Sequence, residues 1–166
     1  MVVTIAIGGW RQIRVSTAID AGDTFGVFVQ RHVGFKGLIF PQRPIASNVA
    51  DSLLRAAQVA VGDLIRKFAP GVRIPGGWVL QKEIGGVGGV DFFVAVYVDA
   101  VTFEEMRQLL GAVRVFFEQR RERGWGEIYS QILVEGRVVG VFQVVVKNNL
   151  GSGVEANVSR QAIEVL

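Results

Sequence analysis

The sequence contains no cysteine and a single histidine among its 166 residues. The absence of cysteine excludes disulfides, zinc–thiolate sites, iron–sulfur clusters and thiol catalysis. One histidine, His32, would be enough for a Ser-His-Asp triad, but it cannot supply the two or three imidazole ligands of many catalytic zinc sites within one chain. The chain therefore lacks the residues of the commonest metal and thiol chemistry, and we expect no cofactor, no metal and no enzymatic activity.

His32 also lacks the sequence neighbours of a catalytic histidine. It follows Arg31 near the end of an expected strand, and the chain has no Gly-x-Ser-x-Gly nucleophile motif. Asp91 and Asp99 stand at opposite ends of one expected strand, too far apart along it to share a metal ion. The simpler interpretation of His32 is a half-buried or surface side chain, and an enzyme with a subunit-interface pocket around it is an alternative.

Long hydrophobic runs are missing, although half of the residues are hydrophobic and the mean hydropathy is +0.38. No apolar run approaches the roughly 18 residues that span a bilayer, because Gly, Arg, Asp or Gln interrupts each of them. The N-terminal residues MVVTIAIGGW lack the basic start of a secretory signal. We expect no membrane segment and no secretion signal, and we expect apolar surfaces that are buried against other subunits.

The glycine-rich segment 83–100, EIGGVGGVDFFVAVYVDA, most resembles an enzyme motif. A dinucleotide-binding loop needs Gly-x-Gly-x-x-Gly between a strand and a helix, because the helix N-terminus holds the pyrophosphate. Gly86 and Gly88 supply the first two positions, but Asp91 stands at the third and a strand is expected to follow. No Gly-Lys-Ser/Thr phosphate-binding pattern occurs. The glycines are therefore interpreted as a turn between two strands.

Hydrophobic periodicity predicts two helices among several strands. The first helix begins at Ser47 or Asn48 as N-cap, and Pro70 and Gly71 stop it. The second begins with a capping box at Thr102 and runs to about residue 123. Strands are expected over residues 2–7, 11–17, 24–33, 76–84, 90–99, 126–134 and 137–148, with an irregular connection over 34–44.

This order predicts an α+β fold with a ferredoxin-like split βαβ arrangement, in which an antiparallel sheet carries both helices on one face. The strand at 90–99 is apolar on both faces and is expected to be central and covered on both sides. We expect one domain over residues 1–166, made of an N-terminal strand extension (1–23), an α+β core (24–148) and a C-terminal tail (149–166).

Arginines on the second helix are the most suggestive polar feature of the chain. The stripe includes Arg107, Arg114 and Arg121, which are spaced seven apart, and Arg120 and Arg123 thicken its C-terminal end. Such a stripe could follow a nucleic-acid backbone or bind an acidic partner. A solvated helix face is the simpler interpretation, because Glu118 is spaced to pair with Arg114 and Arg121, and because the formal net charge is only +3.

One part of the chain resembles a known group of proteins. The helix SLLRAAQVAVGDLIRKFAP, a glycine, and the strands WVLQKEI and FFVAVYV resemble in layout the head–tail joining and tail-completion proteins of long-tailed phages. The strand–helix–hairpin order of the second half is similar to that of phage tail-terminator proteins. The resemblance covers about residues 47–135. It implies a small, non-enzymatic, ring-forming virion protein, and it transfers no individual functional residue.

The leading hypothesis is therefore a non-enzymatic structural or assembly protein that acts through homo-oligomeric interfaces. The resemblance implies a virion component, found in the virion or the host cytoplasm, with other virion proteins as further partners. The alternative is a small nucleic-acid-binding protein that uses the arginine-lined helix face.

Overall fold

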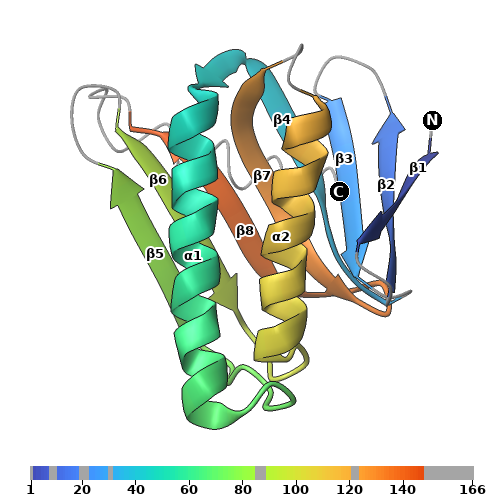
Figure 1. Ribbon diagram of the computed structural model, residues 1–166, viewed down its shortest axis with the longest axis vertical. Helices are drawn as coiled ribbons and strands as arrows, with labels where there is room; N and C mark the ends of the chain where they lie inside the picture. Colours follow the sequence, from blue (N-terminus) through green and yellow to red (C-terminus); the bar gives the residue numbers. More distant parts are fainter. Residues whose placement is uncertain are drawn as a thin grey trace.

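Eight strands and two helices make up the part of the chain that the computed structural model describes (Figure 1). The described residues are 2–7, 11–18, 23–29, 32–84, 89–120 and 124–147, and for 2–7 and 11–18 the description covers the backbone alone. The elements are β1 (Val2–Ile7), β2 (Arg11–Ala18), β3 (Asp23–Val29), β4 (Val33–Ile45), α1 (Ser47–Phe68), β5 (Trp78–Ile84), β6 (Val90–Val96), α2 (Phe103–Gln119), β7 (Trp125–Val134) and β8 (Arg137–Val146).

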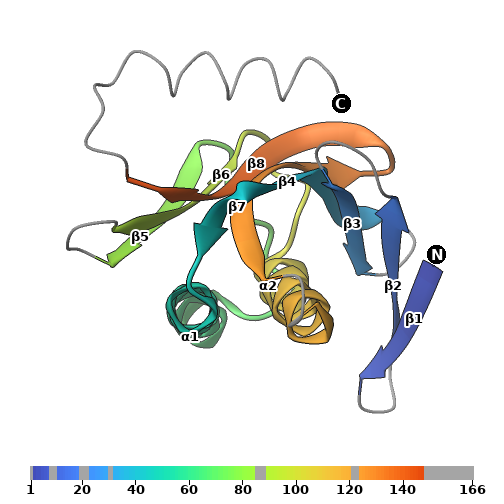
Figure 2. The same cartoon turned by 90° about the horizontal axis from the view of Figure 1, so that it is seen from above.

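All eight strands belong to one sheet in the order β1-β2-β3-β4-β7-β8-β6-β5. Every pair of neighbours is antiparallel. Both helices lie on the same face of this sheet (Figure 2), with α2 against β3 and β4 and α1 against β5 and β6. The expected α+β class, with an antiparallel sheet and two helices, is confirmed. The N-terminal strands continue the sheet of their own chain, because β2 pairs with β3.

The strand order is not that of a simple ferredoxin-like sheet. In a split βαβ arrangement the two strands that precede the helices are neighbours, but here β7 and β8 separate β4 from β6. The cause is the final hairpin. Its two-residue turn, Glu135-Gly136, has positive φ at both positions, which is the geometry of a tight type I′ turn. The turn places β8 beside β7, and β8 then pairs with β6 along seven residues.

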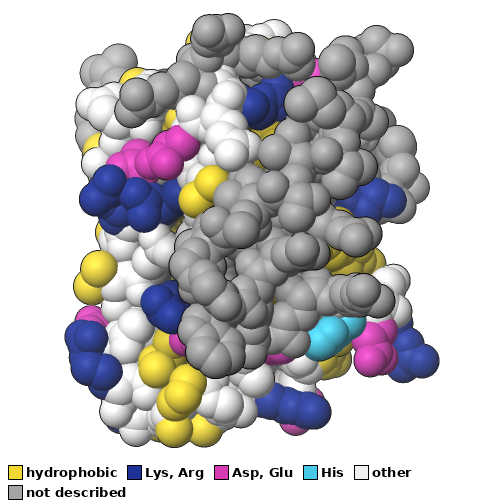
Figure 3. All heavy atoms as spheres, turned by 45° about the vertical axis from the view of Figure 1, so that its right-hand side comes forward, with side chains coloured by type: hydrophobic (Ala, Val, Ile, Leu, Met, Phe, Trp, Pro, Cys, Tyr) yellow, Lys and Arg dark blue, Asp and Glu magenta, His cyan; other side chains and the backbone are white. Residues whose placement is uncertain are grey.

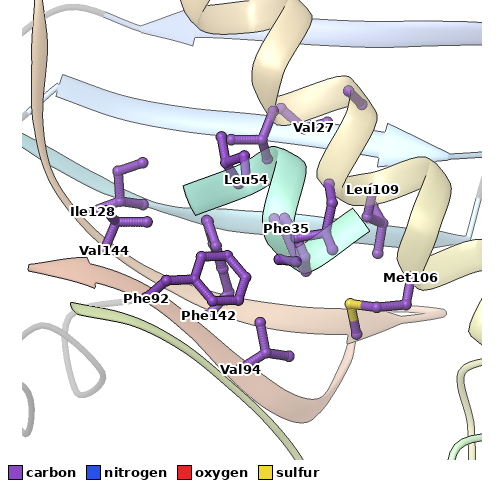
Figure 4. Close-up of a cluster of buried hydrophobic side chains, with 14 of the residues drawn as sticks. Val27, Phe35, Leu54, Phe92, Val94, Met106, Leu109, Ile128, Phe142 and Val144 are labelled. Atoms are coloured by element: carbon purple, nitrogen blue, oxygen red, sulfur yellow. The ribbon is translucent and has the colours of Figure 1, made fainter. Parts of the chain in front are cut away.

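The hydrophobic core lies between the helices and the sheet (Figure 4). The alternation of each central strand sends one set of side chains to this face. On α2 the expected apolar stripe from Phe103 to Phe117 is buried. The side chains labelled in Figure 4 are Val27, Phe35, Leu54, Phe92, Val94, Met106, Leu109, Ile128, Phe142 and Val144, and all ten are essentially inaccessible to solvent.

The prediction of an irregular connection over residues 34–44 is wrong, because these residues form most of β4. This 13-residue strand pairs with β3 on one side and with β7 on the other. The prolines that indicated a loop lie at a local irregularity, where the register with β7 shifts between Phe40 and Pro44. A β-bulge of this kind tolerates residues that have no N–H to donate.

The start of α2 was predicted correctly from the sequence, and the start of α1 was not. The N-cap of α1 is Ala46, which makes no side-chain cap hydrogen bond, so the prediction of Ser47 or Asn48 is wrong by one or two residues. In α2 the predicted capping box is present: Thr102 Oγ1 accepts from the Glu105 backbone N–H at 3.1 Å, and the Glu105 carboxylate accepts from the Thr102 N–H at 2.8 Å. Reciprocal capping satisfies two backbone donors at the start of α2 and fixes where this helix begins.

Candidate interaction surfaces

The arginines of α2 are engaged by carboxylates of the same chain. Arg107 makes two hydrogen bonds to Glu104, at 3.0 and 2.6 Å. Arg114 reaches across to α1, where it donates to Asp51 at 2.8 Å and to Gln58 at 3.1 Å. The expected pairing of Arg114 with Glu118 is therefore replaced by contacts between the two helices.

Arg120 is the most buried of the described arginines in the stripe, with 11% of its side chain exposed. It lies 2.5 Å from an Asp23 carboxylate oxygen on β3 and over the ring of Phe116. Arg121 and Arg123 lie outside the described residues. The described part of the stripe thus joins α2 to α1 and to the sheet, and these contacts lend no support to the nucleic-acid hypothesis.

Asp51 is the centre of the contacts between the helices. Burial is the largest single effect on its pKa and raises it, but the hydrogen bonds and charges of Arg114 and Arg55 together outweigh burial, so the pKa lies below its usual value. A carboxyl group whose pKa is lower in the folded state stabilises the fold above the unfolded-state pKa, about 3.9. That stabilisation is lost as the pH falls through the folded-state pKa.

Asp51→Asn is expected to lower the free energy of unfolding by about 1–2 kcal/mol at pH 7, because it weakens hydrogen bonds to two guanidinium groups in a partly exposed site. Urea unfolding at pH 7 and pH 3 measures the effect, and the deficit should shrink at pH 3. The control is Asp63→Asn, at a carboxylate that is 58% exposed and pairs with Arg66 of the same helix, where about 0.5 kcal/mol or less is expected. A deficit of equal size at both pH values would contradict this account.

His32 Nε2 lies 3.9 Å from Glu105 Oε1, and 42% of the His32 side chain is exposed. Glu105 is already held by the capping box with Thr102. No group of three or more potential metal ligands occurs among the described residues. This setting matches the simpler interpretation of His32 as a surface side chain.

Strand pairing defines the surroundings of the glycine-rich segment. β5 and β6, which flank it, pair antiparallel from Trp78↔Val96 to Ile84↔Val90. A strand rather than a helix thus follows the glycines, which removes the helix N-terminus that a dinucleotide-binding loop requires. Gly85, Gly86 and Gly88 themselves lie outside the described residues, so their conformation stays a prediction. No helix in the described part of the chain is long and apolar enough to cross a membrane.

A buried carboxylate escaped the sequence analysis. Glu127 on β7 is 1% exposed. It precedes Ile128 of the hydrophobic core, so the alternation of the strand places it on the sheet face opposite the helices. It accepts hydrogen bonds from Arg43 at 3.0 Å, from the Val146 backbone N–H at 2.9 Å and from the Tyr129 hydroxyl at 3.4 Å. The hydrogen bond from Arg43 to Glu127 holds the pKa of Arg43 above its usual value. The sequence signal for this buried group was the alternation of polar residues at 127, 129 and 131. The contacts of Glu127 are structural, because they join β4, β7 and β8.

One end of the molecule exposes several large hydrophobic side chains. At this end Val72 O accepts from the Phe103 N–H that opens α2, and Val139 O accepts from the N–H of Tyr97 just after β6. Figure 3 shows hydrophobic side chains gathered at the lower end of the molecule. We call the apolar end the set of Phe68, Val72, Tyr97, Val98 and Val138, whose exposed fractions lie between 41% and 54%.

The second unusual surface is the edge of the sheet at β5, which pairs only with β6 among the described residues. Its helix-side residues Trp78, Leu80 and Ile84 are only partly buried, whereas the residues of β6 on the same face are buried. On the other face Val79 is 52% exposed. The hydrophobic core is therefore open along this edge.

Comparison with known proteins adds no relative: no protein-family model, no curated protein and no solved structure matches the chain.

Proposed function

We propose that this protein is a non-enzymatic assembly subunit that works by associating with copies of itself. The observation that carries the proposal is the apolar end. Large hydrophobic side chains that are exposed together, rather than singly, are typical of surfaces that bind another protein. Here they come from the end of α1 and the segment after it, the segment after β6 and the start of β8.

A virion is the assembly that we propose first. The support for it is the resemblance in layout of about residues 47–135 to phage head–tail joining, tail-completion and tail-terminator proteins. The arginine stripe gives little support to the alternative, a nucleic-acid-binding function, because Arg107, Arg114 and Arg120 already contact carboxylates of the same chain.

Absolute mass by light scattering after size exclusion, over a range of concentrations and salt, tests self-association. We expect a mass above that of the 18.1 kDa chain, with closed rings or filaments in negative-stain images of the same fractions. Weak dependence on salt is expected, because burial of apolar surface drives the association. A monomer at every concentration would overturn the proposal.

A pair of valine substitutions locates the surface. Val98→Lys places a charge in the apolar end, where the valine is 48% exposed, and we expect it to lower the mass at a given concentration. The matched control is Val59→Lys, because Val59 is 63% exposed on α1, outside the apolar end. Both variants should keep the circular dichroism of the native chain. Equal effects of the two would remove the apolar end from the interface.

A further inference from the structure

The edge at β5 is open in a way that natural sheets usually avoid. Edge strands are commonly blunted by prolines, bulges, very short length or charged side chains, because their unpaired N–H and C=O groups can pair with another chain. β5 has no proline, pairs with β6 over seven consecutive positions without a register shift, and is flanked by an incompletely buried core. Of these devices β5 carries only two charged residues, Lys82 and Glu83, so any strand that pairs with it must accommodate both.

We propose that β5 of one copy pairs antiparallel with β5 of a second copy about a two-fold axis at Gln81, which joins two eight-stranded sheets into one. This inference rests on the proposed function of self-association and names one of its interfaces. A two-fold interface brings the same surface of each copy together, so β5 must be complementary to itself.

The sequence of β5 meets this requirement in the register centred on Gln81. The apolar ends of the strand match, because Trp78 of one copy lies opposite Ile84 of the other. An aromatic residue opposite a β-branched one is a favourable cross-strand pair. The methylene stem of Lys82 can cover Leu80 of the second copy, while the ammonium group of the lysine stays in water. The complete register sets Trp78 opposite Ile84 of the second copy, Val79 opposite Glu83, Leu80 opposite Lys82, and Gln81 opposite itself.

Other two-fold registers are worse. Residues directly opposite each other in two paired strands have their side chains on the same side of the sheet. A two-fold axis between two residues would pair side chains from opposite sides, so the axis must pass through a residue. An axis at Lys82 would set two ammonium groups opposite each other, and an axis at Glu83 would do the same with two carboxylates. An axis at Leu80 would pair only residues 78–82. The axis at Gln81 alone pairs all seven residues without opposing like charges.

Charge substitutions at Gln81 test the register, because this exposed side chain should face its own copy. Gln81→Lys alone, and Gln81→Glu alone, should each raise the dissociation constant of the pair up to about fivefold, since each sets like charges opposite each other. An equimolar mixture of the two variants should restore the affinity of the unsubstituted chain, because opposite charges then meet. Failure of the mixture to recover would contradict an axis at this residue.

A cysteine at the same position gives an independent reading, because the chain has no cysteine of its own. Opposed residues of antiparallel strands have Cα atoms about 4.5–5.5 Å apart, which is within disulfide range. Gln81→Cys should therefore form a covalent dimer under mild oxidation at micromolar concentration. The matched control Val59→Cys, exposed on α1, should form little. Equal cross-linking of both would indicate random collision and overturn the proposal.

These measurements separate the two hypotheses. An oligomeric chain whose mass ignores the Gln81 charge substitutions and whose Gln81→Cys variant does not cross-link would refute pairing through β5 and leave self-association standing. A chain that is monomeric at every concentration would refute both. Circular dichroism of each variant, compared with the unsubstituted chain, shows that the fold is retained.

Discussion

Phe142→Ala is expected to lower the free energy of unfolding by about 3–5 kcal/mol, the range for removal of a buried aromatic ring. The reason is its position. Phe142 lies on β8, between β7 and β6, and is fully buried (Figure 4). Its ring stacks on that of Phe35 with centroids 4.7 Å apart, and it meets Phe92 edge-on at 5.5 Å. Removing it opens a cavity between the rings of Phe35 on β4 and Phe92 on β6, which the paired strands of the sheet cannot collapse to fill.

Such a loss is a large part of the roughly 5–15 kcal/mol that stabilises a typical domain. It should lower the melting temperature by about 10 °C, since each kcal/mol is worth about 2–4 °C in a chain of this size. Urea unfolding followed by circular dichroism measures it. The control Phe142→Leu retains most of the volume and should cost less than about 1.5 kcal/mol. A loss below about 1 kcal/mol for the alanine variant would show that this ring cluster does not anchor the core.

Local signals account for the elements that could be predicted from the sequence. The capping box at Thr102, the periodicity of α2 and the Glu135-Gly136 turn each act within a few residues, and the structure contains all three. The strand order could not be read in this way. It depends on the pairing of β6 with β8, which joins residues about fifty positions apart, and no local pattern specifies it.

The candidate surfaces were harder still to predict, because exposure depends on where elements end. Val96 and Val98 stand on the same face of the strand expected over residues 90–99, which was expected to be covered on both sides. β6 ends at Val96, which is buried, and Val98 beyond it is 48% exposed. Likewise, the arginine stripe was visible in the sequence, but the partner of Arg114 is Asp51, on the other helix, 63 positions away.

Gly37→Ala is the second substitution with a large expected effect. Gly37 lies on β4, the strand that was expected to be an irregular connection. A Cβ atom at Gly37 would lie 2.2 Å from the carbonyl oxygen of Tyr129 and 2.4 Å from the Cβ of Ser130, both on β7. Real contacts do not become so short, and the obstacle is partly backbone, so β4 and β7 would have to separate. We expect a loss of about 3 kcal/mol or more, at the upper end of overpacking costs.

Gly62→Ala makes the same chemical change with the opposite expected sign. Gly62 lies inside α1, and a Cβ atom there would meet nothing within 4 Å. Alanine restricts the unfolded chain and favours the helix, so the variant should be more stable by about 0.5–1 kcal/mol. Urea unfolding of both variants separates steric cost from backbone entropy. If Gly37→Ala were also neutral or stabilising, β4 could not lie as close to β7 as the sheet requires, and the assignment of residues 34–44 to a central strand would fail.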